Sequence, residues 1–302
     1  MFRSGFVALL GRPNVGKSTL LNRLVGQKIA ITSPVAQTTR HRIKGVLTSE
    51  KGQIIFLDTP GFSKPLDKLG NYLTDESLAA LSEADVFVMV VDASQPPGKG
   101  DEWVASQIRE TGKFVLLVLN KIDVLKNKPV KLLEHRKLYG DLFSGYPHAK
   151  LLGVSAKTGK HMSELAETVI RKLPEGPAYY PEDAVTDQRI REITAEIIRE
   201  KVLLNTREEI PHSVAVGIES FDETQPELTR IDATLYVDQK SQKGIVIGHE
   251  GSMIKTIGTQ ARHEIEELIE GKVHLALNVK VRENWRKDPA FLKSLGLAPP
   301  TQ

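Results

Sequence analysis

The chain has 302 residues, a formal net charge of +3 and no cysteine. Hydrophobic residues make up 40% and charged residues 26%, which is ordinary for a globular protein and excludes a collagen-like or disordered chain. Without cysteine there can be no disulfide and no thiolate metal site. No apolar run approaches the roughly 18 residues of a membrane-spanning helix, so we expect any membrane contact to be peripheral. The length favours two domains.

The first 172 residues alternate short apolar runs with polar stretches of helical character. The runs are continuous rather than alternating and rich in Val, Ile and Leu, which is typical of strands buried on both faces of a parallel sheet. We expect strands at residues 6–10, 54–57, 86–91, 115–119 and 151–154. The intervening helices give a βαβ order and therefore predict an α/β domain, whose mostly parallel sheet is covered by helices.

A proline-rich stretch then breaks this rhythm, with three prolines and one glycine in residues 173–181. We place a linker at 173–186, because such a composition interrupts both helices and strands. The pattern after it predicts a smaller α+β domain over 187–282, followed by a basic tail at 283–302. Its expected elements are a helix at 187–204, half-exposed strands at 214–221 and 231–237, a glycine-marked turn at 248–251, a helix to about 269 and a strand at 273–281.

The first motif, GRPNVGKS at residues 11–18, fits G-x-x-x-x-G-K-[ST] between a strand and a helix expected over 19–25. Its glycines allow backbone amides and the helix N-terminus to point at phosphates. Lys17 is expected to reach the β- and γ-phosphates, and the Ser18 hydroxyl to bind Mg²⁺. The predicted phosphate-binding residues are Gly11, Arg12, Pro13, Asn14, Val15, Gly16, Lys17, Ser18 and Thr19.

The second motif, DTPG at residues 58–61, follows the strand expected at 54–57. A carboxylate at this strand end can hold Mg²⁺, usually through water, and the Gly61 amide can touch a γ-phosphate. A threonine that completes the Mg²⁺ shell only with a nucleoside triphosphate is expected between the two motifs, and Thr39 is preferred over Thr38. The predicted binding residues here are Thr38, Thr39, Asp58, Thr59, Pro60 and Gly61, with Ser18, Thr39 and Asp58 on the metal and Lys17, Thr39 and Gly61 as catalytic groups.

The third and fourth motifs, NKID at residues 120–123 and SAK at 155–157, also follow apolar runs. The Asp123 carboxylate can accept from N1–H and the N2 amine of guanine, whereas adenine would leave it unpaired. Asn120 is expected to reach N7 and brace nearby loops, and the stem of Lys121 to lie over the base. A backbone amide within 155–157 can donate to guanine O6. The predicted guanine-binding residues are Asn120, Lys121, Asp123, Ser155, Ala156 and Lys157.

All four motifs stand at the C-terminal ends of apolar runs, and those ends share one edge of a parallel sheet. Ligands bind at this edge in open α/β folds, so the motifs together predict guanine-nucleotide binding. An ATPase is the alternative for the nucleotide: it predicts that Asp123→Asn would not shift the base preference toward xanthine.

These strings resemble the Era family of bacterial GTPases, within the TrmE-Era-EngA-like superfamily, over essentially the whole chain. The resemblance implies that Thr39 binds Mg²⁺ in the GTP state and that a potassium ion lies near Asn14. Phe62 stands where Ras-like GTPases carry a water-orienting glutamine, so we expect slow intrinsic hydrolysis.

The turn GHEG at residues 248–251, within an αββααβ order, predicts a type II KH domain that binds RNA. Ile245, Ile247 and Ile254 are candidates for the apolar groove that receives bases, while the Glu250 carboxylate should repel phosphate. Trp285 is read equally well as a stacking platform and as a seal for the end of the domain. The predicted RNA contacts are Lys243, Ile247, Gly248, His249, Glu250, Gly251, Lys255, Trp285, Arg286 and Lys287.

The sequence therefore predicts a GTP-hydrolysing switch that binds single-stranded RNA. The resemblance implies the 3′ end of 16S ribosomal RNA as the partner, in assembly of the 30S ribosomal subunit. We expect Mg²⁺ as cofactor and a monomer in the cytoplasm. Two alternatives stay open. One is a GTP-binding regulatory protein with very slow hydrolysis, whose C-terminal domain binds another RNA or a protein. The other concerns location: peripheral association with the inner face of the cell membrane.

Overall fold

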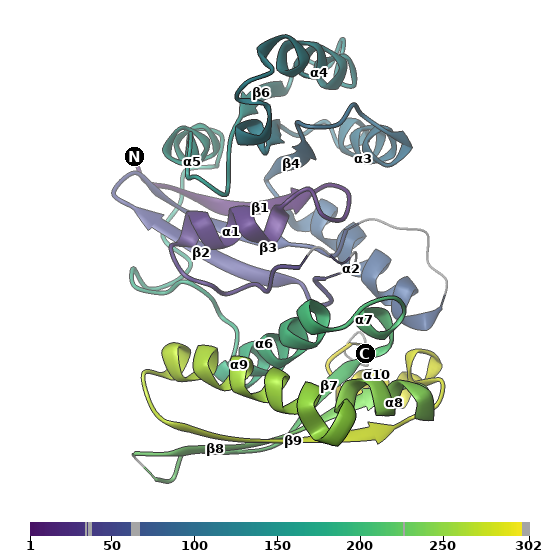
Figure 1. The fold of residues 1–302 in the computed structure, drawn as a ribbon. Coiled ribbons are helices and arrows are strands. Elements are labelled where there is room, and N and C mark those ends of the chain that lie inside the picture. The colour runs from purple at the N-terminus through teal and green to yellow at the C-terminus, as the bar shows by residue number, and fades with distance from the viewer. Residues whose placement is uncertain (34, 36–37, 62–66, 226, 298–302) are drawn as a thin grey trace. The chain divides into compact units, whose positions relative to one another are not determined.

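The computed structural model describes residues 1–33, 35, 38–61, 67–225 and 227–297. These residues divide into two compact units (Figure 1). The first unit is drawn from Met1–Ala30, Thr39–Pro65 and Leu73–Asp187, and the second from Ile31–Thr38, Leu66–Tyr72 and Gln188–Gln302.

A six-stranded sheet with the order β2-β3-β1-β4-β5-β6 forms the centre of the first unit. The strands are β1 (Arg3–Leu10), β2 (Ile43–Ser49), β3 (Gly52–Asp58), β4 (Val86–Asp92), β5 (Val115–Asn120) and β6 (Ala149–Gly153). All neighbours pair in parallel except β2 and β3, which are antiparallel. The mostly parallel sheet confirms the predicted fold class, while β2 was not predicted.

Helices cover both faces of this sheet because successive residues of a buried strand point to opposite sides. On β1, Val7 and Leu9 share a core with α1 (Lys17–Val25) and α5 (Met162–Ile170). Ala8 and Leu10 belong to the opposite core. The helices on that side are α2 (Lys68–Glu83), α3 (Lys99–Glu110) and α4 (Pro129–Asp141).

The stretch expected to be a linker has no regular helix or strand, but it is bound along the first unit. The Ser4 amide donates to the Pro174 carbonyl at 3.1 Å, and the Val46 amide donates to the Val185 carbonyl at 2.8 Å. The side-chain oxygen of Gln53 accepts from the amides of Tyr179 and Tyr180 at 2.8 and 3.0 Å. Ordered contacts of the first unit therefore continue well beyond residue 172.

The second unit contains a three-stranded sheet, β7-β8-β9, with β7 and β8 antiparallel and β8 and β9 parallel. The strands are β7 (Ala215–Asp222), β8 (Thr229–Val237) and β9 (Val273–Val281), and the helices are α6 (Ile190–Asn205), α7 (Ile210–Ser213), α8 (Lys240–Ile247) and α9 (Ser252–Ile269). Apolar residues of α6, α8 and α9 form one core with the strands. Apart from the one-turn α7, the order is the predicted αββααβ, which confirms the second fold class.

Residues after β9 fold onto the second unit, which corrects the expectation of a basic tail from 283. A single 3₁₀ turn, η3 (Trp285–Lys287), precedes α10 (Pro289–Ser294). The Asp288 side chain accepts from the amides of Ala290 and Phe291 and so caps α10. The Phe291 ring is buried and packs edge-on against Tyr236, with 4.8 Å between ring centroids. The apolar residues 291, 292 and 297 explain the folding of this segment.

Candidate functional site

The ends of the parallel strands bring the four sequence motifs to one edge of the first sheet. Gly11 follows β1, Asp58 ends β3, Asn120 ends β5, and Ser155 lies just after β6. The end of β4 lies between those of β1 and β5, and it contributes Asp92, which no motif had indicated.

In the phosphate loop at residues 11–18, the lysine side chain bonds to the backbone of the loop itself. The Lys17 ammonium donates to the carbonyls of Gly11 and Arg12 at 3.1 and 3.2 Å, and the residue is only 7% exposed. Burial lowers the pKa of Lys17, and the nearby Asp58 carboxylate opposes that shift. Gly16 has a φ of 98°, and a Cβ there would lie 2.4 Å from the side-chain nitrogen of Asn120. Only glycine fits this close approach.

Two hydroxyls and one carboxylate meet beside the loop in an arrangement that suits Mg²⁺. The Ser18 hydroxyl donates to Asp58 Oδ2 at 2.7 Å, and the Thr39 hydroxyl lies 3.0 Å from the Ser18 hydroxyl. Asp58 is fully buried, and its Oδ1 has no hydrogen-bond partner among the residues described. Burial raises the pKa of Asp58, against the effects of Lys17 and the two hydroxyls. Three hard oxygen donors with one unsatisfied acceptor fit a magnesium ion.

The structure distinguishes the two candidate threonines. The Thr38 hydroxyl donates to the Val35 carbonyl at 2.6 Å, so it is used within its own segment. The Thr39 side chain reaches both Ser18 and Asp58. Phe62, the residue in place of the water-orienting glutamine, lies outside the described residues.

The guanine motif is built from side chains that position one another. Asp123 Oδ1 accepts from the Ser155 hydroxyl at 2.6 Å. Asn120 donates through Nδ2 to the Val15 carbonyl at 2.9 Å, which ties the base-binding loop to the phosphate loop. Its Oδ1 accepts from the backbone amides of Lys121 and Ala156 at 2.8 and 3.0 Å. The Ala156 amide, a candidate donor to guanine O6, therefore bonds to Asn120 in this structure.

Several predicted binding residues make structural contacts that support this edge. The Thr59 hydroxyl donates to the Leu9 carbonyl at 3.0 Å and is fully buried, so it holds Asp58 in place. A Cβ on Gly61 would come within 2.9 Å of the Pro13 nitrogen, so the two loops lie in close contact. Arg12 forms an ion pair of 2.8 Å with Asp101, whose side chain is fully buried. Sequence reasoning had not singled out Asp101.

On the loop after β6, the guanidinium of Arg23 braces the backbone. It donates to the carbonyls of Ala156 and Lys157 at 3.1 and 2.7 Å. This contact from α1 and the bond from the Ala156 amide to Asn120 together hold residues 155–157 in place.

The turn between α8 and α9 forms the second predicted site. His249 and Glu250 are exposed, as are Lys255 and, at 48%, Ile245. Gly248 has a φ of 75°, and a Cβ there would lie 2.7 Å from the Met253 nitrogen, so a side chain is excluded. The exposed turn at the start of a long helix is the geometry in which an RNA backbone can approach closely.

The predicted RNA contacts after β9 are only partly accessible. Trp285 is fully buried, and its indole N–H donates to the Ser213 carbonyl at 2.8 Å. This corrects the stacking alternative, because a buried ring cannot stack on a base. Arg286 forms an ion pair of 2.8 Å with Asp67, whereas Lys287 is exposed.

Comparison with known families gives a match within each unit. Residues 6–121 match a family model described as "50S ribosome-binding GTPase", and residues 209–286 match one described as "KH domain". The class of protein is therefore a P-loop GTPase that carries a KH domain.

The nearly full-length relatives are more specific. The chain is 49% identical to GTPase Era of Nostoc sp. over 98% of this chain and 90% of that protein, and 48% identical to GTPase Era of Carboxydothermus hydrogenoformans over 98% of both. A solved structure of Era from Aquifex aeolicus bound to GDP and AlF4⁻ has a TM-score of 0.92 and 39% identity over 98% of this chain and 99% of that one. The chain belongs to the GTPase Era family and is a GTPase.

A further solved structure shows which ligands one relative binds. Era in complex with MgGDPNP and nucleotides 1506–1542 of 16S ribosomal RNA superimposes on this chain with a TM-score of 0.92, at 39% identity. The alignment covers 99% of this chain and all of that one.

Proposed function

We propose that this chain is a GTP-dependent switch that binds the 3′ region of 16S ribosomal RNA and acts in assembly of the 30S subunit. The observation that carries the switch is the Thr39 hydroxyl, 3.0 Å from that of Ser18 and within reach of buried Asp58. These groups would hold Mg²⁺, which supplies positive charge at the β- and γ-phosphates. A threonine from a separate segment can then respond to the presence of the γ-phosphate.

The RNA partner follows from the relative solved with nucleotides 1506–1542 of 16S RNA, since that protein aligns with both units of this chain. The family model for the first unit names the 50S particle, but it covers only residues 6–121. The full-length relative is the more specific guide, so we assign the small subunit.

An RNA-binding measurement with the Gly251→Asp variant tests this assignment. Gly251 has a φ of 78° and open space around its Cβ position, so the new carboxylate enters the turn that would face phosphate. Gly145→Asp is the matched control, because Gly145 has a φ of 74° and similarly open space. We expect a 16S 3′-end oligonucleotide to bind the control normally and Gly251→Asp at least about tenfold more weakly. Equal binding by the two variants would contradict an RNA site at this turn.

We assign residues 1–172 to the nucleotide-binding domain, 173–186 to the connection and 187–282 to the KH domain.

We also propose potassium as an activating ion near Asn14, whose backbone lies in the left-handed region at a φ of 63°. Hydrolysis should be faster in potassium than in sodium at the same ionic strength. Equal rates in the two salts would exclude a specific potassium site.

For location, we propose a monomer in the cytoplasm, with peripheral attachment to the inner face of the membrane as the alternative. Within the described residues, none of the helices combines the length and the apolarity that membrane crossing requires. Fractionation of cells that express the tagged protein separates the two, because a peripheral fraction would be released from membranes by high salt.

A further inference from the structure

Asp92, at the end of β4, is the residue of this edge to which no motif assigns a role. Strand β4 lies between β1 and β5, and Asp92 is in register with Asn120 of the neighbouring strand. The residue is 7% exposed. A buried carboxylate needs polar partners. The partners of Asp92 connect it to the loop that carries the guanine motif and, through that loop, to the phosphate loop.

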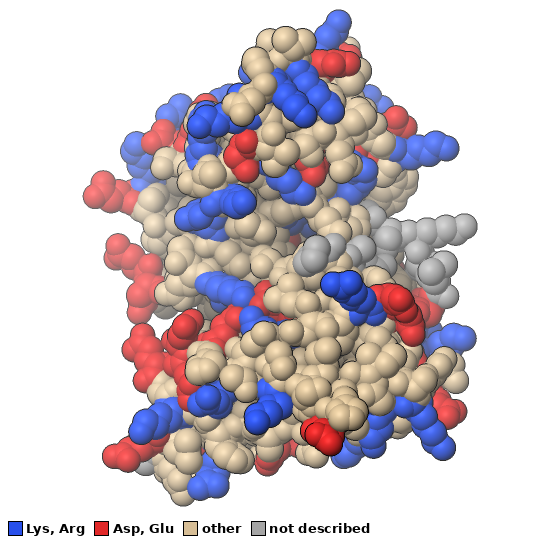
Figure 2. Space-filling model, in the orientation of Figure 1, with Lys and Arg blue, Asp and Glu red and all other residues tan. Residues whose placement is uncertain are grey.

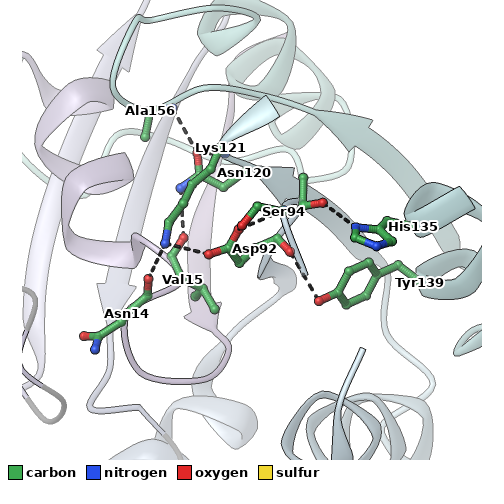
Figure 3. Close-up of polar contacts among 10 residues, drawn as sticks. Asn14, Val15, Asp92, Ser94, Asn120, Lys121, His135, Tyr139 and Ala156 are labelled. Atoms are coloured by element: carbon green, nitrogen blue, oxygen red, sulfur yellow. Dashed lines mark hydrogen bonds and ion pairs between the residues drawn. The ribbon is translucent and has the colours of Figure 1, made fainter. Parts of the chain in front are cut away.

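The Lys121 ammonium lies between Asp92 and the phosphate loop (Figure 3). It donates to Asp92 Oδ2 at 2.7 Å and to the Asn14 carbonyl at 2.7 Å. The other carboxylate oxygen of Asp92 accepts from the amide and the hydroxyl of Ser94, at 2.9 and 2.6 Å. Both carboxylate oxygens are therefore bonded, and the ammonium has one defined position.

The backbone that carries Asp92 is itself held from two sides. The Ala93 amide donates to the Asn120 carbonyl at 2.8 Å. From α4, His135 Nδ1 donates to the Ala93 carbonyl at 2.7 Å, and the Tyr139 hydroxyl lies 3.4 Å from the Asp92 carbonyl. Both α4 side chains are buried. Because its backbone is held in this way, the Asp92 carboxylate has little freedom to move. It can therefore fix the position of the flexible Lys121 side chain.

Two disfavoured backbone conformations meet at this ammonium. Asn14 has a φ of 63° and Lys121 a φ of 66°, in the left-handed region that residues other than glycine seldom adopt. The bond from the Lys121 side chain to the Asn14 carbonyl joins these two residues. Burial acts to raise the pKa of Asp92, but the hydrogen bonds from Lys121 and Ser94 outweigh it and hold the pKa below its usual value. The ion pair is thus maintained at neutral pH.

We propose that Asp92 is a positioning residue for nucleotide binding, which fixes the Lys121 ammonium on the Asn14 carbonyl and so joins the guanine loop to the phosphate loop. The proposal rests on the nucleotide site described above and adds the residue that organises it. The partners of the Asp92 carboxylate are Lys121 and Ser94, whereas the candidate Mg²⁺ ligands beside the phosphate loop bond to one another, so loss of Asp92 should affect GTP and GDP equally. A loosened loop releases its ligand faster, so the effect should fall on the dissociation rate.

A double-mutant cycle on dissociation of fluorescent GDP and GTP tests this role. Asp92→Asn should raise both dissociation rates by about tenfold or more, which is typical for loss of a charge-assisted hydrogen bond. Lys121→Met should raise them at least as much, since it also removes the stem expected over the base. The double variant should dissociate no faster than Lys121→Met, because Asp92 acts through that lysine. A purely structural role would make the two effects multiply.

Asp85→Asn is the matched control, because Asp85 lies just before the other end of β4 and accepts from the Phe6 amide at 2.8 Å. Its dissociation rates should equal those of the parent. Ser94→Ala removes one hydroxyl donor from Asp92 and leaves the ion pair with Lys121, so it should raise both dissociation rates a few-fold. This variant replaces Asp92→Asn in the cycle if Asp92→Asn fails to fold. Parental dissociation from Asp92→Asn, or multiplied effects in the cycle, would overturn the proposal. A parent protein that bound neither nucleotide would instead refute the nucleotide site itself.

Discussion

The Asp123 carboxylate is directed by the Ser155 hydroxyl, which donates to its Oδ1 at 2.6 Å. Guanine presents two donors, N1–H and the N2 amine, to a carboxylate so placed. Adenine presents a lone pair at N1 instead, which would leave a charge unpaired in the site. Base selection therefore depends on one group whose orientation is set by a neighbouring loop.

Asp123→Asn should transfer the preference from guanine to xanthine nucleotides, because an amide can donate to the xanthine carbonyl where a carboxylate cannot. We expect the ratio of GTP to XTP affinity to change by on the order of 10⁴-fold. Competition binding with both nucleotides measures this ratio. An unchanged ratio would show that Asp123 does not read the base, as the ATPase alternative requires.

Thr39→Ala should weaken the Mg²⁺-dependent part of GTP binding by at least about tenfold and leave GDP binding nearly unchanged. The reason is that its hydroxyl approaches Ser18 and Asp58, the other two candidate ligands. Thr38→Ala is the matched control, since that hydroxyl bonds within its own segment. A magnesium titration with each nucleotide distinguishes the variants. If Thr38→Ala were the more damaging change, the assignment of Thr39 would be wrong.

Residues inside recognised motifs could be predicted because their spacing and flanking strands carry the signal, and the structure brings those of the first unit together at one sheet edge. Asp92 and Asp101 could not, since a single aspartate after a strand or within a helix resembles many solvated ones. Their partners, Lys121 and Arg12, lie far away in the sequence, and only the folded chain shows the pairs. Trp285 had two equal readings, and its buried indole decides between them.

At the scale of elements, four of the five runs predicted as strands stand out because both of their faces are buried, while the fifth overlaps the partly exposed edge strand β6 and was recognised by its apolar residues. Strand β2 escaped prediction because it is an edge strand whose residues are partly exposed, and a lysine and a glycine interrupt its apolar pattern. The segment after β9 was read as a tail because basic residues stand next to Trp285 at its start. Its few apolar side chains nevertheless bury enough surface to fold it, with Trp285 and Phe291 in contact at 6.3 Å between ring centroids.

Trp285→Ala should destabilise the second unit by about 3–5 kcal/mol, because it leaves a large cavity and the Ser213 carbonyl without its donor. Lys287→Ala, at the exposed end of the same 3₁₀ turn, should leave stability unchanged. Urea unfolding of the isolated variants measures both effects. A Trp285→Ala protein of normal stability would contradict the role of this ring as a seal.

At the scale of the molecule, the two units offer ligand sites of different chemistry. The first gathers buried charges and hydroxyls at the end of a parallel sheet, which suits a nucleotide with its metal. The second presents an exposed turn beside an exposed isoleucine, which suits an extended RNA strand. Figure 2 shows basic and acidic side chains interspersed on the face it presents. With a net charge of only +3, RNA binding should depend on local geometry as well as on charge.

The switch proposal requires the nucleotide state and the RNA to influence each other. Crosslinking of the 16S 3′ end should therefore be stronger in one nucleotide state than in the other. Because coupling between two binding sites is reciprocal, the RNA should change the ratio of GTP to GDP affinity by the same factor by which the nucleotide state changes RNA affinity. Crosslinking that is identical with GTP and GDP would show that the two sites are independent.

Single-turnover hydrolysis of GTP, measured with and without a 16S 3′-end RNA, tests the central claim most directly. We expect slow phosphate release from the protein alone and a changed rate when the RNA is bound. The control is Asp123→Asn, which should lose GTP turnover at the same nucleotide concentration and regain activity with XTP. Absence of phosphate release both with and without RNA would contradict the assignment of this chain as a GTP-hydrolysing, RNA-linked switch.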